Sequence, residues 1–95
     1  MTESNPAFTA RESLSVAGTA TPLTAATYLN ARYALISVET VQIRFTIDGT
    51  TPTSTLGHLA DPGDVIELQN QDQVRKFQAI TSGATATLMV SYGGR

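Results

Sequence analysis

The sequence has no cysteine and no tryptophan, and only three Phe and three Tyr among its 95 residues. Without cysteine, disulfides, thiolate catalysis and Cys-ligated zinc or iron–sulfur sites are excluded. Because aromatic residues are few, the core has to be built mainly from Val, Ile, Leu and Ala. A chain of this length buries a smaller share of its surface than a larger domain does, so we expect a thin core that gains from oligomerisation or docking.

Charge is also scarce. Six basic and eight acidic residues give a formal net charge of −2, and the only basic pair is Arg75 and Lys76, which we expect at a solvated strand edge. This pattern offers no basic patch for nucleic acid. No apolar run reaches the ~18 residues of a membrane span, and residues 1–8 lack the basic and apolar regions of a signal peptide. We therefore expect no nucleic-acid or membrane partner, and synthesis in the cytoplasm.

The groups that catalyse reactions or bind metals are few. His58 is the single histidine, and we assign it to loop structure or to a contact with a partner. The carboxylates closest in sequence have spacings that match no EF-hand loop; they are Asp48, Asp61, Asp64 and Glu67. We therefore predict no enzyme activity and no catalytic, cofactor or metal site, and we expect Asp48 and Asp61 to cap turns.

Hydrophobic residues follow the period of β-strands rather than of helices. Val41, Ile43, Phe45 and Ile47 alternate with polar residues, which is typical of a strand with one buried face. Other strands are predicted over 13–17, 33–38, 65–68, 74–80 and 85–92. The two residues Glu39 and Thr40 predict a hairpin between 33–38 and 41–48. The fold class is therefore all-β: a single small antiparallel sandwich or flattened barrel of six or seven strands, Ig-like or jelly-roll-like. The residues predicted to form its core are Ile36, Val38, Val41, Ile43, Phe45, Ile47, Leu68, Phe77, Leu88 and Val90.

The segment 47–64 contains two sequence patterns that predict turns, one near each of its ends. Asp48 and Gly49 tolerate positive φ and Pro52 fixes its own φ, so the Thr-rich stretch after the 41–48 strand should be a structured loop. Farther on, the sequence Asp61-Pro62-Gly63 has Pro and Gly where a type II turn requires them.

The same loop carries a resemblance to known families. Residues 43–53, Ile-Arg-Phe-Thr-Ile-Asp-Gly-Thr-Thr-Pro-Thr, resemble the signature of small Ig-like modules of chitobiase C-terminal type. A longer likeness adds residues 34–39, Gly57-His58, 62–64, 77–80 and 86–92. Taken together, the chain is similar to the compact all-β proteins encoded among the virion structural genes of tailed bacteriophages.

This resemblance implies a virion structural protein, most simply a capsid decoration or cement protein on the particle surface that binds the major capsid protein or other virion subunits. It also implies a homo-oligomer, with a trimer favoured over a dimer. The candidate partner contacts of the loop are Thr50, Thr51, Thr53 and His58. The alternatives are a carbohydrate-directed or accessory Ig-like module, and a head–tail or tail accessory protein.

The N-terminal segment 1–12 is polar, is interrupted by Pro6 and has one large apolar residue, Phe8. Such a segment has too little apolar surface to offset its ordering entropy. We expect an extended arm ahead of a β-domain over 13–95. The arm would become ordered against a partner, with Phe8 as the anchor and Arg11 and Glu12 as polar contacts.

Overall fold

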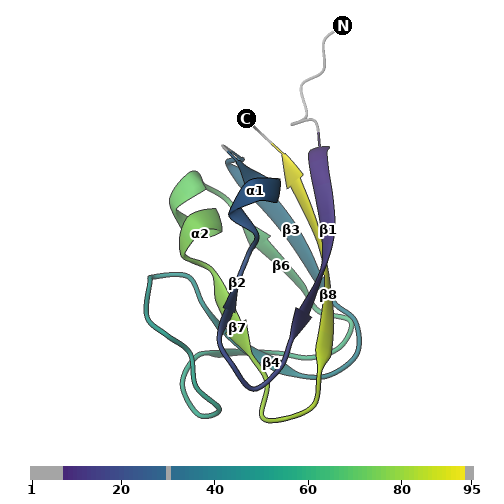
Figure 1. Cartoon of the computed structure of the whole chain (residues 1–95), viewed down its shortest axis with the longest axis vertical. Helices are drawn as coiled ribbons and strands as arrows, with labels where there is room; N and C mark the ends of the chain where they lie inside the picture. The colour runs from purple at the N-terminus through teal and green to yellow at the C-terminus, as the bar shows by residue number, and fades with distance from the viewer. Residues whose placement is uncertain (1–7, 30, 94–95) are drawn as a thin grey trace, which may run out of the picture.

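The computed structural model describes residues 8–29 and 31–93, and in this range the chain forms two antiparallel four-stranded sheets packed face to face (Figure 1). Sheet A has the strand order β1-β8-β3-β6, and sheet B has the order β2-β7-β4-β5. The prediction of an all-β antiparallel sandwich is confirmed. Eight strands replace the six or seven expected, because the connection over 19–27 contributes the two-residue strand Thr21–Pro22 and the chain after the Thr-rich loop contributes the three-residue strand His58–Ala60.

Sheet A contains the three longest strands and both ends of the described chain. Its strands are β1 (Phe8–Val16), β3 (Tyr33–Val38), β6 (Val65–Leu68) and β8 (Ala86–Gly93). The strands of sheet B are shorter. They are β2 (Thr21–Pro22), β4 (Ile43–Thr46), β5 (His58–Ala60) and β7 (Gln78–Ile80).

Consecutive strands change sheet at every connection except the one between β4 and β5. The hairpin expected at Glu39 and Thr40 is therefore wrong: β3 lies in sheet A, and β4 lies in sheet B. Glu39 and Thr40 do not have the positive φ angles that a tight hairpin turn needs. The connection over 39–42 instead carries the chain across to sheet B. Its first part stays tied to sheet A, because the hydroxyl of Thr40 accepts a hydrogen bond from the amide of Thr87 in β8 at 3.0 Å.

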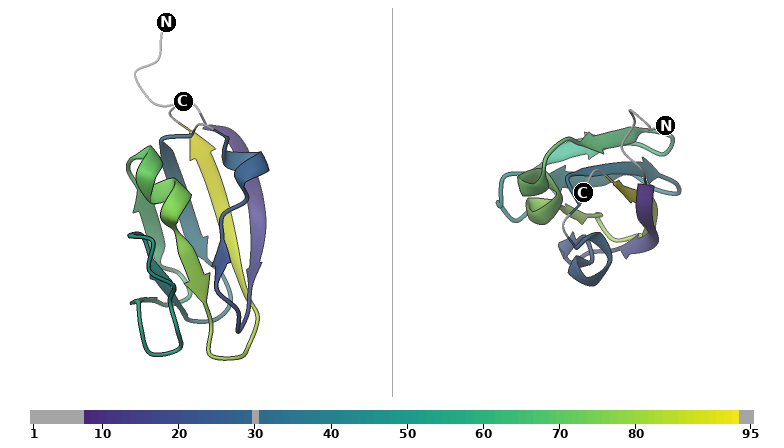
Figure 2. Two further views of the ribbon diagram at one scale, coloured as in Figure 1. Left: turned by 60° about the vertical axis from the view of Figure 1, so that its left-hand side comes forward. Right: turned by 90° about the horizontal axis from the view of Figure 1, so that it is seen from above.

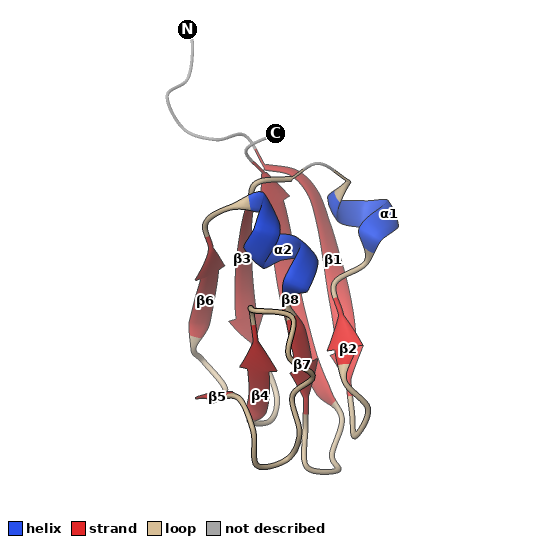
Figure 3. Ribbon diagram, turned by 90° about the vertical axis from the view of Figure 1, so that its left-hand side faces the viewer, coloured by secondary structure: helices blue, strands red, loops and turns tan. Residues whose placement is uncertain are grey.

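Two short helices lie at one end of the sandwich (Figure 3): α1 (Ala25–Tyr28) and α2 (Gln71–Lys76). The expected strand over 74–80 is therefore wrong in its first half. The side chain of Asn70 caps α2 by accepting the amide of Gln73 at 2.9 Å, and the Gln73 side chain accepts the amide of Gln69 at 2.7 Å. The Asn70 cap satisfies an amide of the first turn, and the Gln73 contact holds the chain that enters the helix, so a helix begins here. Arg75 and Lys76 lie in its last turn, not on a strand edge.

The core fills the space between the sheets. Of the residues predicted for it, Val41, Phe45 and Ile47 are only partly buried and pack against its rim. The others are buried: Ile36, Val38, Ile43, Leu68, Phe77, Leu88 and Val90. The core also includes large side chains that were not expected there, among them Tyr92, Val16, Val74 and Leu14.

The first strand begins earlier than predicted. β1 starts at Phe8 and pairs with β8 along its length, from Phe8 opposite Gly93 to Val16 opposite Ala86. Residues 8–12 of the expected arm are therefore an edge strand of sheet A, because β8 supplies backbone partners that composition alone does not reveal. Residues 1–7 of the arm, and the side chain of its proposed anchor Phe8, lie outside what the structure describes.

Figure 2 shows the resulting arrangement from two further sides. β1 and β2 form one lateral edge of the sandwich, and β5 and β6 form the other. The chain between β5 and β6 is the Asp61–Asp64 turn predicted from the sequence. There the amide of Asp64 donates to the carbonyl of Asp61 at 2.9 Å, and Gly63 has a φ of +95°.

Candidate functional site

The Thr-rich segment 47–57, with the predicted partner contacts Thr50, Thr51 and Thr53, is an ordered loop that folds back over the outer face of sheet B. In Figure 3 the chain leaves the tip of β4 and returns along the front of this sheet before it enters β5. Pro52 is buried although it lies in a loop. Its ring is therefore packed against neighbouring residues rather than exposed to solvent.

Arg44 fixes the returning part of the loop. Its side chain points to the outer face of β4, where Nε donates to the carbonyl of Ser54 at 2.9 Å and the guanidinium NH1 nitrogen donates to the carbonyl of Gly57 at 3.0 Å. A planar guanidinium can hold two carbonyls in one geometry. The loop is therefore clamped at two points by a side chain from the strand beneath it.

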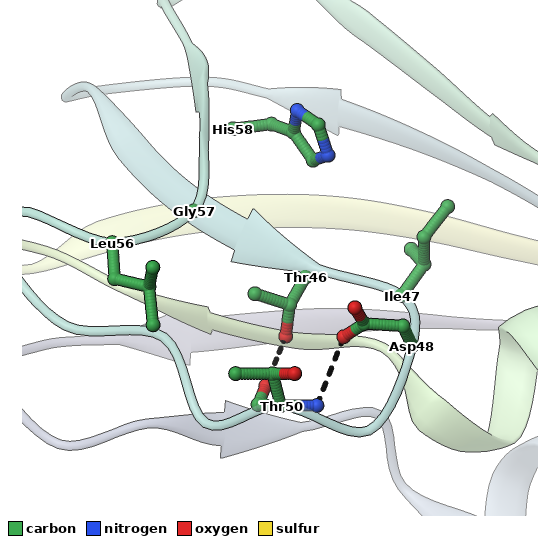
Figure 4. Close-up of a pocket in the computed structure, with 7 residues that line it drawn as sticks. All are labelled: Thr46, Ile47, Asp48, Thr50, Leu56, Gly57 and His58. Atoms are coloured by element: carbon green, nitrogen blue, oxygen red, sulfur yellow. Dashed lines mark hydrogen bonds between the residues drawn. The ribbon is translucent and has the colours of Figure 1, made fainter.

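The first turn of the loop is held by Asp48, as predicted. Asp48 Oδ1 accepts the amide of Thr50 at 2.9 Å, and Gly49 has a φ of +92°. The hydrogen bonds from Thr50, first of all from its backbone amide, lower the pKa of Asp48, and His58 contributes a smaller lowering. The hydroxyl of Thr46 also donates to the carbonyl of Thr50 (Figure 4). Asp48 is therefore an ionised cap at neutral pH.

The second turn is formed by Thr53. Its hydroxyl accepts the amides of Thr55 at 3.2 Å and Leu56 at 3.0 Å, and its own amide donates to the carbonyl of Leu56 at 3.0 Å. The side chain of Thr53 is thus used within the loop.

Gly57 lies closely against β4. It has a φ of +130°, and a Cβ atom added there would lie 3.1 Å from the carbonyl oxygen of Phe45. Only glycine meets both conditions without strain. The chain can therefore pass directly from the loop into β5, whose first residue is His58.

These contacts leave an open pocket of about 350 Å³ between the two arms of the loop. Figure 4 shows the seven residues that line it: Thr46, Ile47, Asp48, Thr50, Leu56, Gly57 and His58. Two of the predicted partner contacts, Thr50 and His58, are brought together here. Thr51 and Thr53 are exposed in the same loop but do not line the pocket.

The pocket has a mixed apolar and polar character. Leu56 is 49% exposed, and the ring of His58 lies 5.5 Å from the ring of Phe45, centroid to centroid, at a tilt of 44°. Phe45 is itself stacked on the buried Phe77 at 5.7 Å. The imidazole is therefore supported from the core side, while His58 remains an exposed residue.

The polar contacts predicted in the N-terminal segment lie elsewhere. Arg11 is exposed on β1. Glu12 was expected to contact a partner, but its carboxylate is used inside the domain, where Oε1 accepts the hydroxyl of Thr24 at 2.7 Å and Oε2 accepts the amide of Thr24 at 3.2 Å. It also accepts the hydroxyl of Tyr92. No local sequence pattern indicates these contacts, because the partners are 12 and 80 residues away along the chain.

Among residues 8–29 and 31–93, no group of three or more His, Asp or Glu side chains is placed to hold a metal ion. No helix in this range is long and apolar enough to cross a membrane. No family model matches the chain, and no significant match was found among curated proteins or solved structures.

Proposed function

We propose that this protein is a virion structural subunit of a tailed bacteriophage, most simply a decoration or cement protein that binds capsid subunits on the surface of the particle. The proposal joins the resemblance of the sequence to the geometry of the 47–57 loop. Adhesion requires a fixed surface with exposed apolar and hydrogen-bonding groups, and little chemistry beyond that.

One observation carries the proposal: the loop that holds the resemblance is clamped, and it presents its exposed groups together. Arg44, Asp48 and the buried Pro52 fix its backbone. Leu56, which is 49% exposed, lines the same pocket as Thr50 and His58. A rigid loop loses little entropy on binding, so its contacts contribute more of their energy to affinity.

The partner is a capsid subunit or another virion subunit. The oligomer expected from the resemblance fits this role, because repeated copies on a lattice gain avidity from one another. The proposed location is the capsid surface, reached after synthesis in the host cytoplasm. The proposed mode of action is non-enzymatic.

The test is particle occupancy of loop variants, measured on particles purified from the phage that encodes the chain. Leu56→Asp places a charge on the proposed contact surface and should lower occupancy at least about tenfold, since a buried unpaired charge is costly at an interface. The matched control is Leu29→Asp, which changes a leucine that is 58% exposed beside α1. Equal occupancy of both variants would reject the loop as the contact surface.

A second candidate function is carbohydrate binding, as in the chitobiase-type modules. It is favoured by one observation: a carboxylate, a hydroxyl and an imidazole, from Asp48, Thr50 and His58, line one open pocket. Such groups hydrogen-bond sugar hydroxyls. Chemical-shift changes confined to these residues on titration with chitin or peptidoglycan oligosaccharides would support this function, and would count against the capsid role if occupancy on particles were also nil.

A further inference from the structure

The outer face of sheet A carries an arrangement of side chains that the proposed function does not explain. In each strand of this sheet, alternate residues point into the core and the others point outward. Solvent reaches the outward set, in which Met89 is 38% exposed and Val65 is 57% exposed. The face is on the opposite side of the molecule from the 47–57 loop, which lies over sheet B.

The strand register arranges the outward residues in rows that cross all four strands. The first row, in the order β1, β8, β3 and β6, is Arg11, Ser91, Leu35 and Glu67. The second row, in the same order, is Ser13, Met89, Ser37 and Val65. Each row contains a large apolar residue next to a serine at its centre, and the first row has opposite charges at its two ends.

A twofold rotation about an axis that runs along the strands, between β8 and β3, reverses the order of each row. A second copy placed in this way would set Met89 over Ser37 of the partner subunit, and Leu35 over Ser91 of the partner subunit. Large side chains would then meet small ones in both rows. Complementary sizes allow two sheets to interdigitate at their ordinary spacing of ~10 Å.

The charges obey the same symmetry. Within one chain, Arg11 and Glu67 lie three strand spacings apart, which is ~14 Å and too far for an ion pair. The rotation brings each Arg11 opposite Glu67 of the partner subunit, so the pair forms twice. Glu67 is held in place on this face, because its carboxylate accepts the hydroxyl of Tyr33 at 3.2 Å and the side-chain amide of Gln69 at 3.5 Å.

We propose that the outer face of sheet A binds a second copy of this chain in a twofold dimer whose axis runs along the strands, so that β8 of one copy faces β3 of its partner. This surface is separate from the loop surface, so a dimer could present two loops to a particle. The surface chemistry favours a twofold pair over the trimer that the resemblance implied. A four-stranded face is only ~19 Å wide, so we expect a dimer at the weak end of specific association, with a Kd in the micromolar range or above.

The test is sedimentation velocity of the whole protein from about 1 µM to 1 mM, which brackets weak association. Arg11→Glu and Glu67→Arg each place like charges opposite one another, twice per dimer, and each should raise the Kd roughly tenfold. The double variant Arg11→Glu/Glu67→Arg restores opposite charges and should bring the Kd back towards that of the wild type. Arg75→Glu, on the exposed end of α2, is the matched control and should leave the Kd unchanged.

Met89→Lys is a second test that does not depend on the ion pairs, because it places a charge at the centre of the face. This variant should also raise the Kd of the dimer. A monomer at all concentrations, a trimer, or a double variant that fails to recover would overturn the proposal. A protein that is monomeric in solution, but whose Met89→Lys variant loses particle binding, would assign this face to a different virion subunit. In that case the proposed function would be retained and the dimer proposal would be rejected.

Discussion

The carboxylate of Glu12 on β1 accepts a hydrogen bond from the hydroxyl of Tyr92 on β8, 80 residues farther along the chain. The same carboxylate binds the hydroxyl and amide of Thr24, the residue that precedes α1. Tyr92 is buried, and its ring lies 6.0 Å from the ring of Tyr28 in α1. Glu12 thus joins the edge strand, the last strand and the first helix.

Glu12→Ala should therefore destabilise the protein by about 1.5 to 3 kcal/mol, because it leaves the hydroxyl of Tyr92 without this acceptor and removes a charged hydrogen-bonding group. Glu12→Gln should cost less, since an amide oxygen can still accept. The measurement is urea unfolding, with Ser13→Ala on the exposed side of β1 as the control. Equal stability of Glu12→Ala and Ser13→Ala would show that the Glu12 contacts contribute little.

Removing residues 1–12 should lower the thermal midpoint strongly, by the equivalent of at least about 2 kcal/mol, because the deletion takes half of β1 and the Glu12 hydrogen bonds with it. For residues 8–12 the structure contradicts the expectation from composition, in which they were part of an independent arm. Differential scanning calorimetry of the truncated protein would decide. An unchanged midpoint would mean that sheet A does not need the first half of β1.

Gly57→Ala should cost about 1 to 3 kcal/mol, because a Cβ at a φ of +130° is strained and would press on the carbonyl of Phe45. Gly18→Ala is the matched control, since no atom lies within 4 Å of the added Cβ there. Chemical denaturation of the two variants gives the comparison. If Gly18→Ala proved the more damaging of the two, the described path of the chain from the loop into β5 would be incorrect.

The free energy of unfolding should decrease at alkaline pH, and ionisation of Tyr92 should cause part of this decrease. Burial, followed by the nearby Glu12 carboxylate, raises the pKa of the Tyr92 phenol. The neutral phenol is therefore favoured in the folded state. Its contribution is fully present below the ordinary tyrosine pKa of about 10 and is lost as the pH rises beyond that value. Unfolding free energies measured from pH 8 upward should fall above pH 10, and Tyr92→Phe should flatten part of that fall. An unchanged slope in Tyr92→Phe would remove Tyr92 as its source.

Much of the fold was predictable because alternation and turn chemistry are local. β3, β6 and the Asp61–Asp64 turn lie where the pattern places them, and β8 is displaced by a single residue. Alternation does not specify which strand becomes the neighbour of another. The hairpin expected at Glu39 and Thr40 was wrong for that reason, since β3 pairs with β8 and β6 instead.

The helix α2 was missed although its signal was present. Asn70 and Gln73 have the spacing of a reciprocal cap, and Val74 and Phe77 are both buried at a helical spacing of three. The prediction assigns one β-strand to the whole segment 74–80. In the structure the chain changes from helix to strand at Phe77.

The candidate site was predictable in part. The turn residue Asp48 and the predicted partner contacts Thr50 and His58 were identified from the loop sequence, and the structure places all three around one pocket. The clamp by Arg44 was not predicted, because the residue appears in sequence only as a polar position of a strand. Its importance depends on the loop folding back over sheet B, which is a tertiary event.

The most direct test of the proposed role is whether this protein is present in gradient-purified particles of a tailed phage whose genome carries its sequence, and in what copy number relative to the major capsid protein, measured by quantitative mass spectrometry. A decoration subunit should be present in a fixed ratio to the capsid subunits. Particles that lack it should remain intact but should be less resistant to heat. A protein that is abundant in infected cells yet missing from purified particles would contradict the account.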